Sequence, residues 1–137
     1  MSVLHPMMAL VVWTLAVCLL VLIVRIRAAQ QGRITMRDLS LGESQRVPAD
    51  VALFNRNFVN LLEMPMLFYV ACLTLYVTKT ADGVAVILAW LYVALRVCHS
   101  LIHVTYNNVI HRAGAYAAST VALVVIWIRA FVALSGG

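Results

Sequence analysis

Apolar residues fill four long segments of the chain, and polar residues collect between them. The apolar runs cover residues 6–24, 52–77, 84–97 and 114–134, and the third continues with polar interruptions toward residue 105. A helix needs about 20 predominantly apolar residues to cross a bilayer. Each run can reach that length, the second and third only by including polar groups. The pattern predicts a single domain, residues 1–137, with four membrane helices at approximately 6–27, 50–78, 83–106 and 112–134.

Composition agrees with this pattern. Hydrophobic residues make up 64% of the 137 residues and charged residues 11%, which leaves too little polar surface to cover a soluble globule. The first run lacks a basic leader and a small-residue cleavage site, and Arg25 and Arg27 follow it directly, so we expect it to remain as a membrane helix. The sequence therefore predicts an all-α, multi-pass integral membrane protein.

Basic residues are distributed unevenly. The net charge is +5, yet most of the positive charge falls between the end of the first run and the beginning of the second. The residues concerned are Arg25, Arg27, Arg33, Arg37, Arg46 and Arg56. In a short loop this bias indicates cytoplasmic orientation rather than a nucleic-acid footprint, so we expect no nucleic-acid partner. The turn near residues 107–112 should then also be cytoplasmic, with both termini on the far side.

A stripe of polar side chains enters the second run. Arg56, Asn60 and Glu63 stand at positions i, i+4 and i+7, and at about 100° per residue they fall within a sector roughly 60° wide on a helix. Charged groups in a membrane helix are costly and usually face protein, water or a ligand. Asp50 is the predicted N-cap of this helix, and Pro65 is expected to kink it just beyond Glu63.

A second polar stripe ends the third run. Arg96, His99 and His103 stand at i, i+3 and i+7, again within roughly 60° on a helix. The short turn between the second and third helices predicts antiparallel packing, which brings both stripes to the same depth. Glu63 and Arg96 are then natural ion-pair partners. One hypothesis is that they form only a buried structural pair, and the other is that the stripes together bind an anion.

The two stripes resemble the family of membrane-associated proteins in eicosanoid and glutathione metabolism (MAPEG). Two motifs carry the resemblance. The first is Arg-x3-Asn-x2-Glu followed by a proline, and the second is Arg-x2-His-x3-aromatic-x8-Arg. In this chain they are Arg56, Asn60, Glu63 and Pro65, and then Arg96, His99, His103 and Arg112 with Tyr116 one turn later. The Val-Arg-Ile-Arg end of the first run, 24–27, is also similar to the family's.

The resemblance implies a four-helix protomer in a homotrimer, with glutathione bound between neighbouring protomers at the cytoplasmic side. It implies that Arg112 stabilises the thiolate and that the position of His103 belongs to the catalytic set. The implied binding residues are Arg25, Arg56, Asn60, Glu63, Arg96, His99 and Tyr116. The implied function is a glutathione- or thiol-dependent transferase or peroxidase acting on hydrophobic electrophiles from the bilayer. The chain looks closest to the family's bacterial branch, which implies the bacterial inner membrane.

Three departures from the family pattern keep other functions open. His103 stands where glutathione-using members have a tyrosine, and Ala113 replaces a serine found in the prostaglandin synthase. Pro65 follows Glu63 by two residues rather than by three or four. The first alternative is a non-catalytic protein that binds a lipid or a partner. The second is a proton-coupled exporter built on Glu63, although nearby arginines favour an ionised carboxylate. The third is a metal site at His99 and His103, which lacks an obvious third ligand other than Glu63 or His111.

Overall fold

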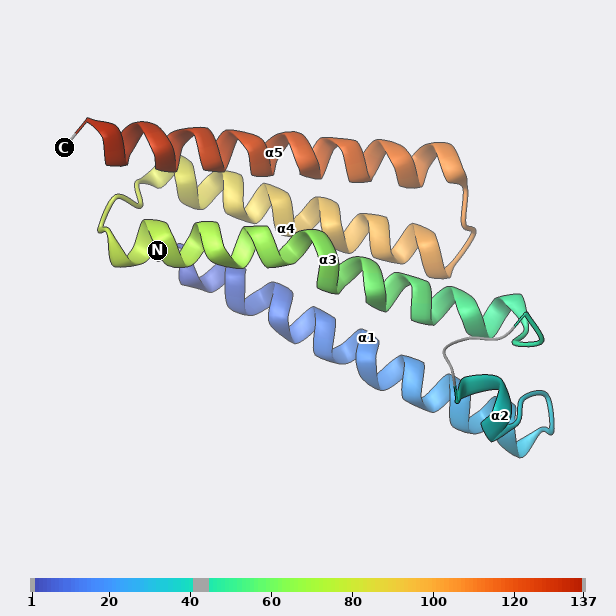
Figure 1. Cartoon of the computed structure of the whole chain (residues 1–137). Coiled ribbons are helices and arrows are strands. Elements are labelled where there is room, and N and C mark those ends of the chain that lie inside the picture. The colour runs from blue at the N-terminus through green and yellow to red at the C-terminus, as the bar shows by residue number, and fades with distance from the viewer. Residues whose placement is uncertain (1, 41–44, 137) are drawn as a thin grey trace.

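The computed structural model describes residues 2–40 and 45–136, and it is a bundle of four long helices with one short helix beside it (Figure 1). The long helices are α1 (Leu4–Gln30), α3 (Ala49–Val77), α4 (Gly83–Val104) and α5 (Val109–Ser135). The short helix α2 (Met36–Leu39) lies in the connection between α1 and α3. The four long helices are each long and apolar enough to cross a membrane. The predicted all-α, four-helix membrane fold is confirmed.

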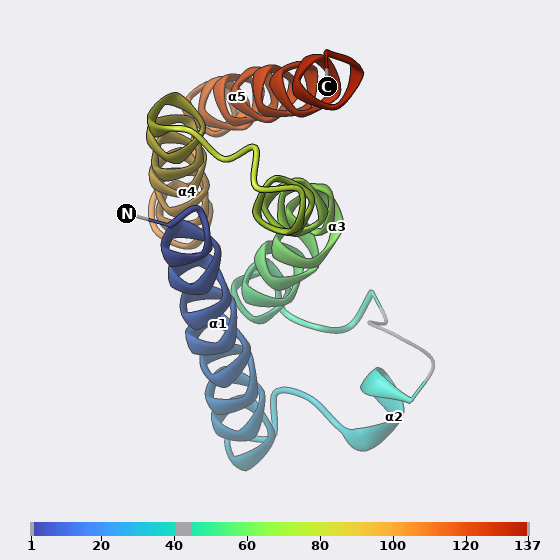
Figure 2. The same cartoon turned by 90° about the vertical axis from the view of Figure 1, so that its left-hand side faces the viewer.

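The helices pack around a core that runs along the bundle. Viewed from one end, α5, α4 and α1 form a curved row and α3 lies on its inner side (Figure 2). The closest pairings are α4 with α5 and α1 with α3. At the centre, the Phe68 ring of α3 stacks on the Tyr92 ring of α4 with 4.4 Å between centroids, and both side chains are fully buried.

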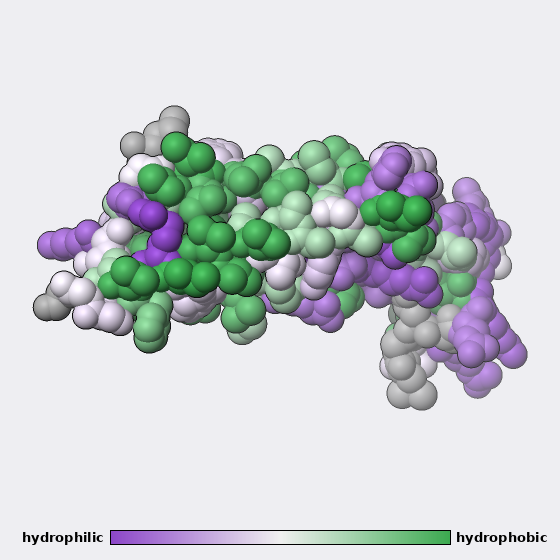
Figure 3. Space-filling model, turned by 90° about the horizontal axis from the view of Figure 1, so that it is seen from above, coloured by the Kyte–Doolittle hydropathy of each residue, from purple (hydrophilic) through white to green (hydrophobic). Residues whose placement is uncertain are grey.

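The outer surface is suited to lipid. Figure 3 shows a band of hydrophobic side chains between two hydrophilic ends. Exposed leucine, isoleucine and valine side chains line the outside of α1, including Leu15, Leu19 and Leu22. A soluble monomer rarely exposes so large a continuous apolar surface, so the surface supports integration into a bilayer.

The start of α3 differs from the prediction. The helix begins at Ala49, and Pro48 is its N-cap. The Pro48 carbonyl already accepts hydrogen bonds from the backbone N–H groups of Val51 and Ala52, so Asp50 lies inside the first turn. Its carboxylate instead accepts two bonds from Arg33 Nη2, at 2.7 and 2.9 Å. The expectation that Asp50 caps the helix is therefore wrong.

Pro65 lies inside α3, as expected. Proline has no backbone N–H, so the Leu61 carbonyl one turn earlier loses its helical donor, and the ring crowds that turn. The helix changes direction near its middle (Figure 1), which agrees with the predicted kink.

A buried polar contact joins α3 to α4. Asn57 and Ser100 are both fully buried, and Asn57 Nδ2 donates to Ser100 Oγ at 2.7 Å. The two neighbours of Asn57 in the chain are less buried: Arg56 is exposed and Phe58 is partly buried. The contact fixes how α3 is rotated against α4, because a polar group in this environment needs a partner.

Charged groups lie at the end of the bundle where α3 turns into α4. Asp82 is the N-cap of α4, and its Oδ1 accepts from the Ala85 backbone N–H at 2.8 Å. Its other oxygen accepts from Arg129 Nη2 of α5. The hydrogen bond from Ala85, together with the Arg129 guanidinium, holds the pKa of Asp82 below its usual range.

This lowered pKa predicts a pH-dependent contribution of Asp82 to stability. A carboxyl group with a lower pKa when folded stabilises the protein above its unfolded pKa, and the contribution disappears as the pH falls through the folded pKa. Asp82→Asn keeps the capping oxygen and removes the charge. We expect the variant to unfold at a lower temperature than the wild type near neutral pH, with the gap closing in acid. Thermal unfolding in detergent across pH measures this, and a constant gap would contradict it.

The buried amide predicts coupling between Asn57 and Ser100. In a double-mutant cycle of Asn57→Ala and Ser100→Ala, we expect an interaction free energy of about 0.6 kcal/mol, and up to about 1.7 kcal/mol, as for other hydrogen bonds between membrane helices. Equilibrium unfolding in mixed micelles provides the four free energies. Strictly additive effects would show that the bond contributes nothing to stability.

Candidate functional site

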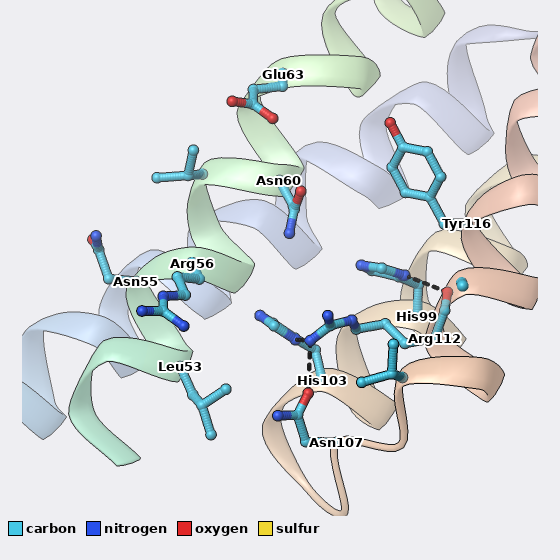
Figure 4. Close-up of a pocket in the computed structure, with 13 residues that line it drawn as sticks. Leu53, Asn55, Arg56, Asn60, Glu63, His99, His103, Asn107, Arg112 and Tyr116 are labelled. Atoms are coloured by element: carbon cyan, nitrogen blue, oxygen red, sulfur yellow. Dashed lines mark hydrogen bonds between the residues drawn. The ribbon is translucent and has the colours of Figure 1, made fainter. Parts of the chain in front are cut away.

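A cavity of about 680 Å³ opens where α4 turns into α5, opposite the N-terminal half of α3 (Figure 4). Its volume lies within the range of about 300–1,000 Å³ typical of small-molecule sites. Seven of the nine predicted site residues line it: Arg56, Asn60, Glu63, His99, His103, Arg112 and Tyr116. The two predicted stripes do meet at one level of the bundle.

Helical spacing explains this meeting. Arg56, Asn60 and Glu63 recur on one face of α3 and form one wall. His99 and His103 come from the last turns of α4 and form part of the facing wall (Figure 4). Because α3 and α4 run antiparallel, the beginning of one lies beside the end of the other.

Arg112 is held by two side chains, one from α4 and one from the turn that connects α4 to α5. Its Nη1 donates to His103 Nδ1 and to Asn107 Oδ1, both at 2.7 Å. Asn107 has a left-handed backbone with φ of 45°, and its N–H donates to the Ile102 carbonyl at 2.8 Å. Asparagine tolerates this conformation better than most residues. The sequence interpretation placed Asn107 in a turn but missed its role as an anchor for Arg112.

The two histidines of the cavity wall each have one buried nitrogen without a partner among the described residues. His99 Nδ1 donates to the Arg112 carbonyl at 3.0 Å, and the His99 ring lies 5.7 Å from the Tyr116 ring. In the described part of the chain, Nε2 of His99 and Nε2 of His103 are buried and have no hydrogen-bond partner. Both point toward α3 (Figure 4).

Arg96 is buried below the cavity instead of lining it. It is only 1% exposed, and its guanidinium lies 5.5 Å from the Tyr92 ring centre and 4.9 Å from that of Tyr116. Nε donates to the Tyr92 hydroxyl at 3.1 Å, whereas Nη1 and Nη2 have no partner among the described residues. The expected Glu63–Arg96 ion pair is wrong, because aromatic rings enclose Arg96 while Glu63 is exposed on α3.

Arg25 lies in a different place. It borders a mostly apolar crevice between the last turns of α1 and α2, together with Leu22, Ile26 and Ile34. Within one chain, the structure does not bring Arg25 to the cavity.

The electrostatics of the cavity favour an anion. The guanidiniums of Arg56 and Arg112 face one carboxylate, that of Glu63. The first turn of α5 also borders the cavity, and a helix N-terminus carries partial positive charge. No group of three or more His, Cys, Asp or Glu side chains within residues 2–40 and 45–136 is arranged to hold a metal ion.

Comparison with known proteins identifies one family. The model of the MAPEG family matches residues 3–132, which is nearly the whole chain. Neither a curated protein nor a solved structure was found to match the chain.

Asn107 has two roles that substitutions can separate: its backbone adopts the left-handed conformation, and its side chain accepts a hydrogen bond from Arg112. Asn107→Gly keeps the backbone conformation and removes the acceptor for Arg112. We expect it to lower the free energy of unfolding by about 1.5–3 kcal/mol, as for a hydrogen bond to a charged group. Asn107→Ala should lower this free energy by about 1 kcal/mol more than Asn107→Gly does, because the left-handed conformation is unfavourable for alanine. Unfolding free energies in mixed micelles measure both steps. An alanine variant as stable as the glycine variant would contradict the second.

Proposed function

The chain belongs to the MAPEG family, and on that premise we propose that it is a glutathione- or thiol-dependent transferase or peroxidase acting on hydrophobic electrophiles in the membrane. The observation that carries the proposal is the cavity that joins Arg56, Arg112 and the N-terminus of α5 with uncharged hydrogen-bonding groups. Cations and helix N-termini lower the pKa of a nearby thiol and favour its thiolate form. The thiolate is the nucleophile that glutathione supplies.

Glutathione fits the donor set of the cavity. Buried nitrogens of His99 and His103 lack partners among the described residues, and such groups are costly unless a ligand or water satisfies them. Glu63 can accept hydrogen bonds from the amine of the tripeptide, and Arg56 can bind a carboxylate. Asn60 and Tyr116 add uncharged donors and acceptors. Arg96 holds the Tyr116 ring from below.

Arg112 has the central catalytic role in this proposal. Its Nη1 is held by two neutral acceptors, so the positive charge of the guanidinium is fixed in place without being neutralised. In this proposal the other N–H groups of Arg112 donate to the sulfur. A fixed cation of this kind stabilises developing negative charge at little reorganisation cost.

We further propose that the site is completed in a homotrimer. Glu63 is exposed near the middle of α3, among exposed apolar residues such as Leu62 and Met66. A carboxylate at that level is costly against acyl chains, whereas a neighbouring protomer would cover the open side of the cavity. Arg25, which lies away from the cavity of its own chain, would then reach the site of a neighbour.

The orientation follows from the distribution of charge. The cavity lies at the same end of the bundle as the arginine-rich connection between α1 and α3. By the positive-inside rule this end faces the cytoplasm, where glutathione is available. We place the protein in a bacterial inner membrane with the cavity toward the cytoplasm.

A second candidate is a non-catalytic MAPEG protein that binds a lipid or a partner. His103 replaces the tyrosine of the glutathione-using members, and its Nδ1 is occupied by Arg112. If the imidazole only supports Arg112, the cavity could hold an anionic lipid headgroup while the acyl chains lie along the apolar helices.

Calorimetric titration of the purified protein with glutathione tests the proposal. We expect binding at micromolar to low-millimolar concentration, and Arg112→Ala should weaken it about tenfold to a hundredfold, because a charge-assisted hydrogen bond contributes about 1.5–3 kcal/mol. Arg37→Ala is the matched control, since it removes the same charge from α2 and should leave binding unchanged. Absence of heat, with lipid retained through purification, would favour the second candidate.

A further inference from the structure

The rings of His99 and His103 stand side by side at the edge of the cavity. Their centroids are 6.0 Å apart and their planes differ by 22°. Both residues are nearly buried, with 4% and 3% of their surface exposed. Each uses Nδ1 for a contact with Arg112 and directs Nε2 toward α3 (Figure 4).

The partner of His99 determines its tautomer. Nδ1 faces the backbone carbonyl of Arg112 at 3.0 Å, and a carbonyl can only accept. Nδ1 therefore carries the proton. In the neutral ring Nε2 is then a lone-pair acceptor.

The partner of His103 determines the opposite tautomer. Its Nδ1 lies 2.7 Å from Arg112 Nη1, and a guanidinium can only donate. Nδ1 must therefore be the acceptor, and the proton is on Nε2. Through its carbonyl and its guanidinium, Arg112 fixes one ring as an acceptor toward the cavity and the other as a donor.

This pair distinguishes between classes of ligand. The oxygens of a carboxylate or phosphate only accept, so they would leave His99 Nε2 unsatisfied, and an ammonium only donates, so it would leave His103 unsatisfied. A thiol can do both. Both rings direct Nε2 toward α3 (Figure 4), and their centroids are 6.0 Å apart. We therefore expect one sulfur atom, seated in front of the two ring edges, to contact both nitrogens.

We propose that His99 is the general base that removes the proton of the bound thiol, while His103 Nε2–H donates to the sulfur; this inference rests on the proposed function. In the step, the S–H bond breaks with its electron pair left on sulfur, and a new N–H bond forms at His99 Nε2. The resulting imidazolium keeps its Nδ1–H bond to the Arg112 carbonyl. Arg112 is the positioning residue for both rings as well as a source of positive charge.

Charges on three helices surround the transferred proton. Arg96 and His103 of α4 and Arg112 of α5 are nearest, and Arg56 and Glu63 of α3 lie across the cavity. Transfer of a proton to His99 beside these guanidiniums requires a negative charge close by. The sulfur supplies that charge in the same step, so we expect proton transfer only when a thiol is bound.

The tautomers can be tested without any reaction. The chain has four histidines, so an imidazole ¹⁵N spectrum of labelled protein in detergent can be assigned by comparing the wild type with His99→Gln and His103→Gln. We expect a protonated Nδ1 with a bare Nε2 for His99, and the reverse for His103. Two rings with the same tautomer, or two imidazoliums at neutral pH, would overturn the proposal.

The proton transfer is tested by ultraviolet difference titration of bound glutathione. His99→Gln can still form hydrogen bonds but cannot take up the proton, so we expect the ionised fraction of the bound thiol at neutral pH to fall about tenfold and turnover with a hydrophobic electrophile to fall about 100-fold, as for loss of a general base. S-methylglutathione has no S–H group and should bind wild type and variant alike. His5→Gln, near the N-terminus and outside the cavity lining, is the matched control and should behave as wild type.

The outcomes separate the two proposals. If glutathione binds and ionises equally in wild type and His99→Gln, His99 is not the base, although the proposed function stands. If glutathione does not bind to the wild type, the proposed function is overturned and the catalytic role of His99 with it. The ¹⁵N spectrum would still show in that case whether the paired tautomers exist.

Discussion

The bundle depends on finding partners for the polar side chains that one face of α4 carries into an apolar environment. Arg96, His99, Ser100 and His103 are all buried, and an unsatisfied polar group in such surroundings costs several kcal/mol. Each of them contacts a polar or aromatic group on α3, α4 or α5. These contacts fix the rotation of α4 relative to its neighbours in a way that apolar packing alone would not.

The same requirement links the stability of the bundle to the chemistry of the cavity. Arg112 belongs to α5 but holds two groups on α4 and one on the turn between them. The cavity wall is therefore part of the contact between α4 and α5, the most extensive in the bundle. On the cavity wall, Nε2 of His99 and Nε2 of His103 have no hydrogen-bond partner among the described residues, as expected for a site that a ligand completes.

Much of this arrangement could be read from the sequence, because it follows from helical periodicity. The four membrane helices follow from the apolar runs, and Arg56, Asn60 and Glu63 share a wall because their spacing places them within one sector. Periodicity does not give the rotation of one helix against another. It therefore failed for Arg96, which aromatic rings enclose, and it left Asn57 unassigned, although Asn57 forms the hydrogen bond to Ser100 of α4. Arg25 could not be placed, since the tilt of α1 and the course of the following connection depend on tertiary packing.

Pro65 has a position with a further consequence. It follows Glu63 by two residues, and Glu63 is the last residue of α3 that borders the cavity. The bend thus separates α3 into a half that packs in the apolar core and a half that forms one wall of the site. Moving the proline along the helix would change the direction of this wall and the width of the opening while every lining side chain stayed the same. Related chains could in this way acquire a preference for larger or smaller ligands through a single change in the backbone.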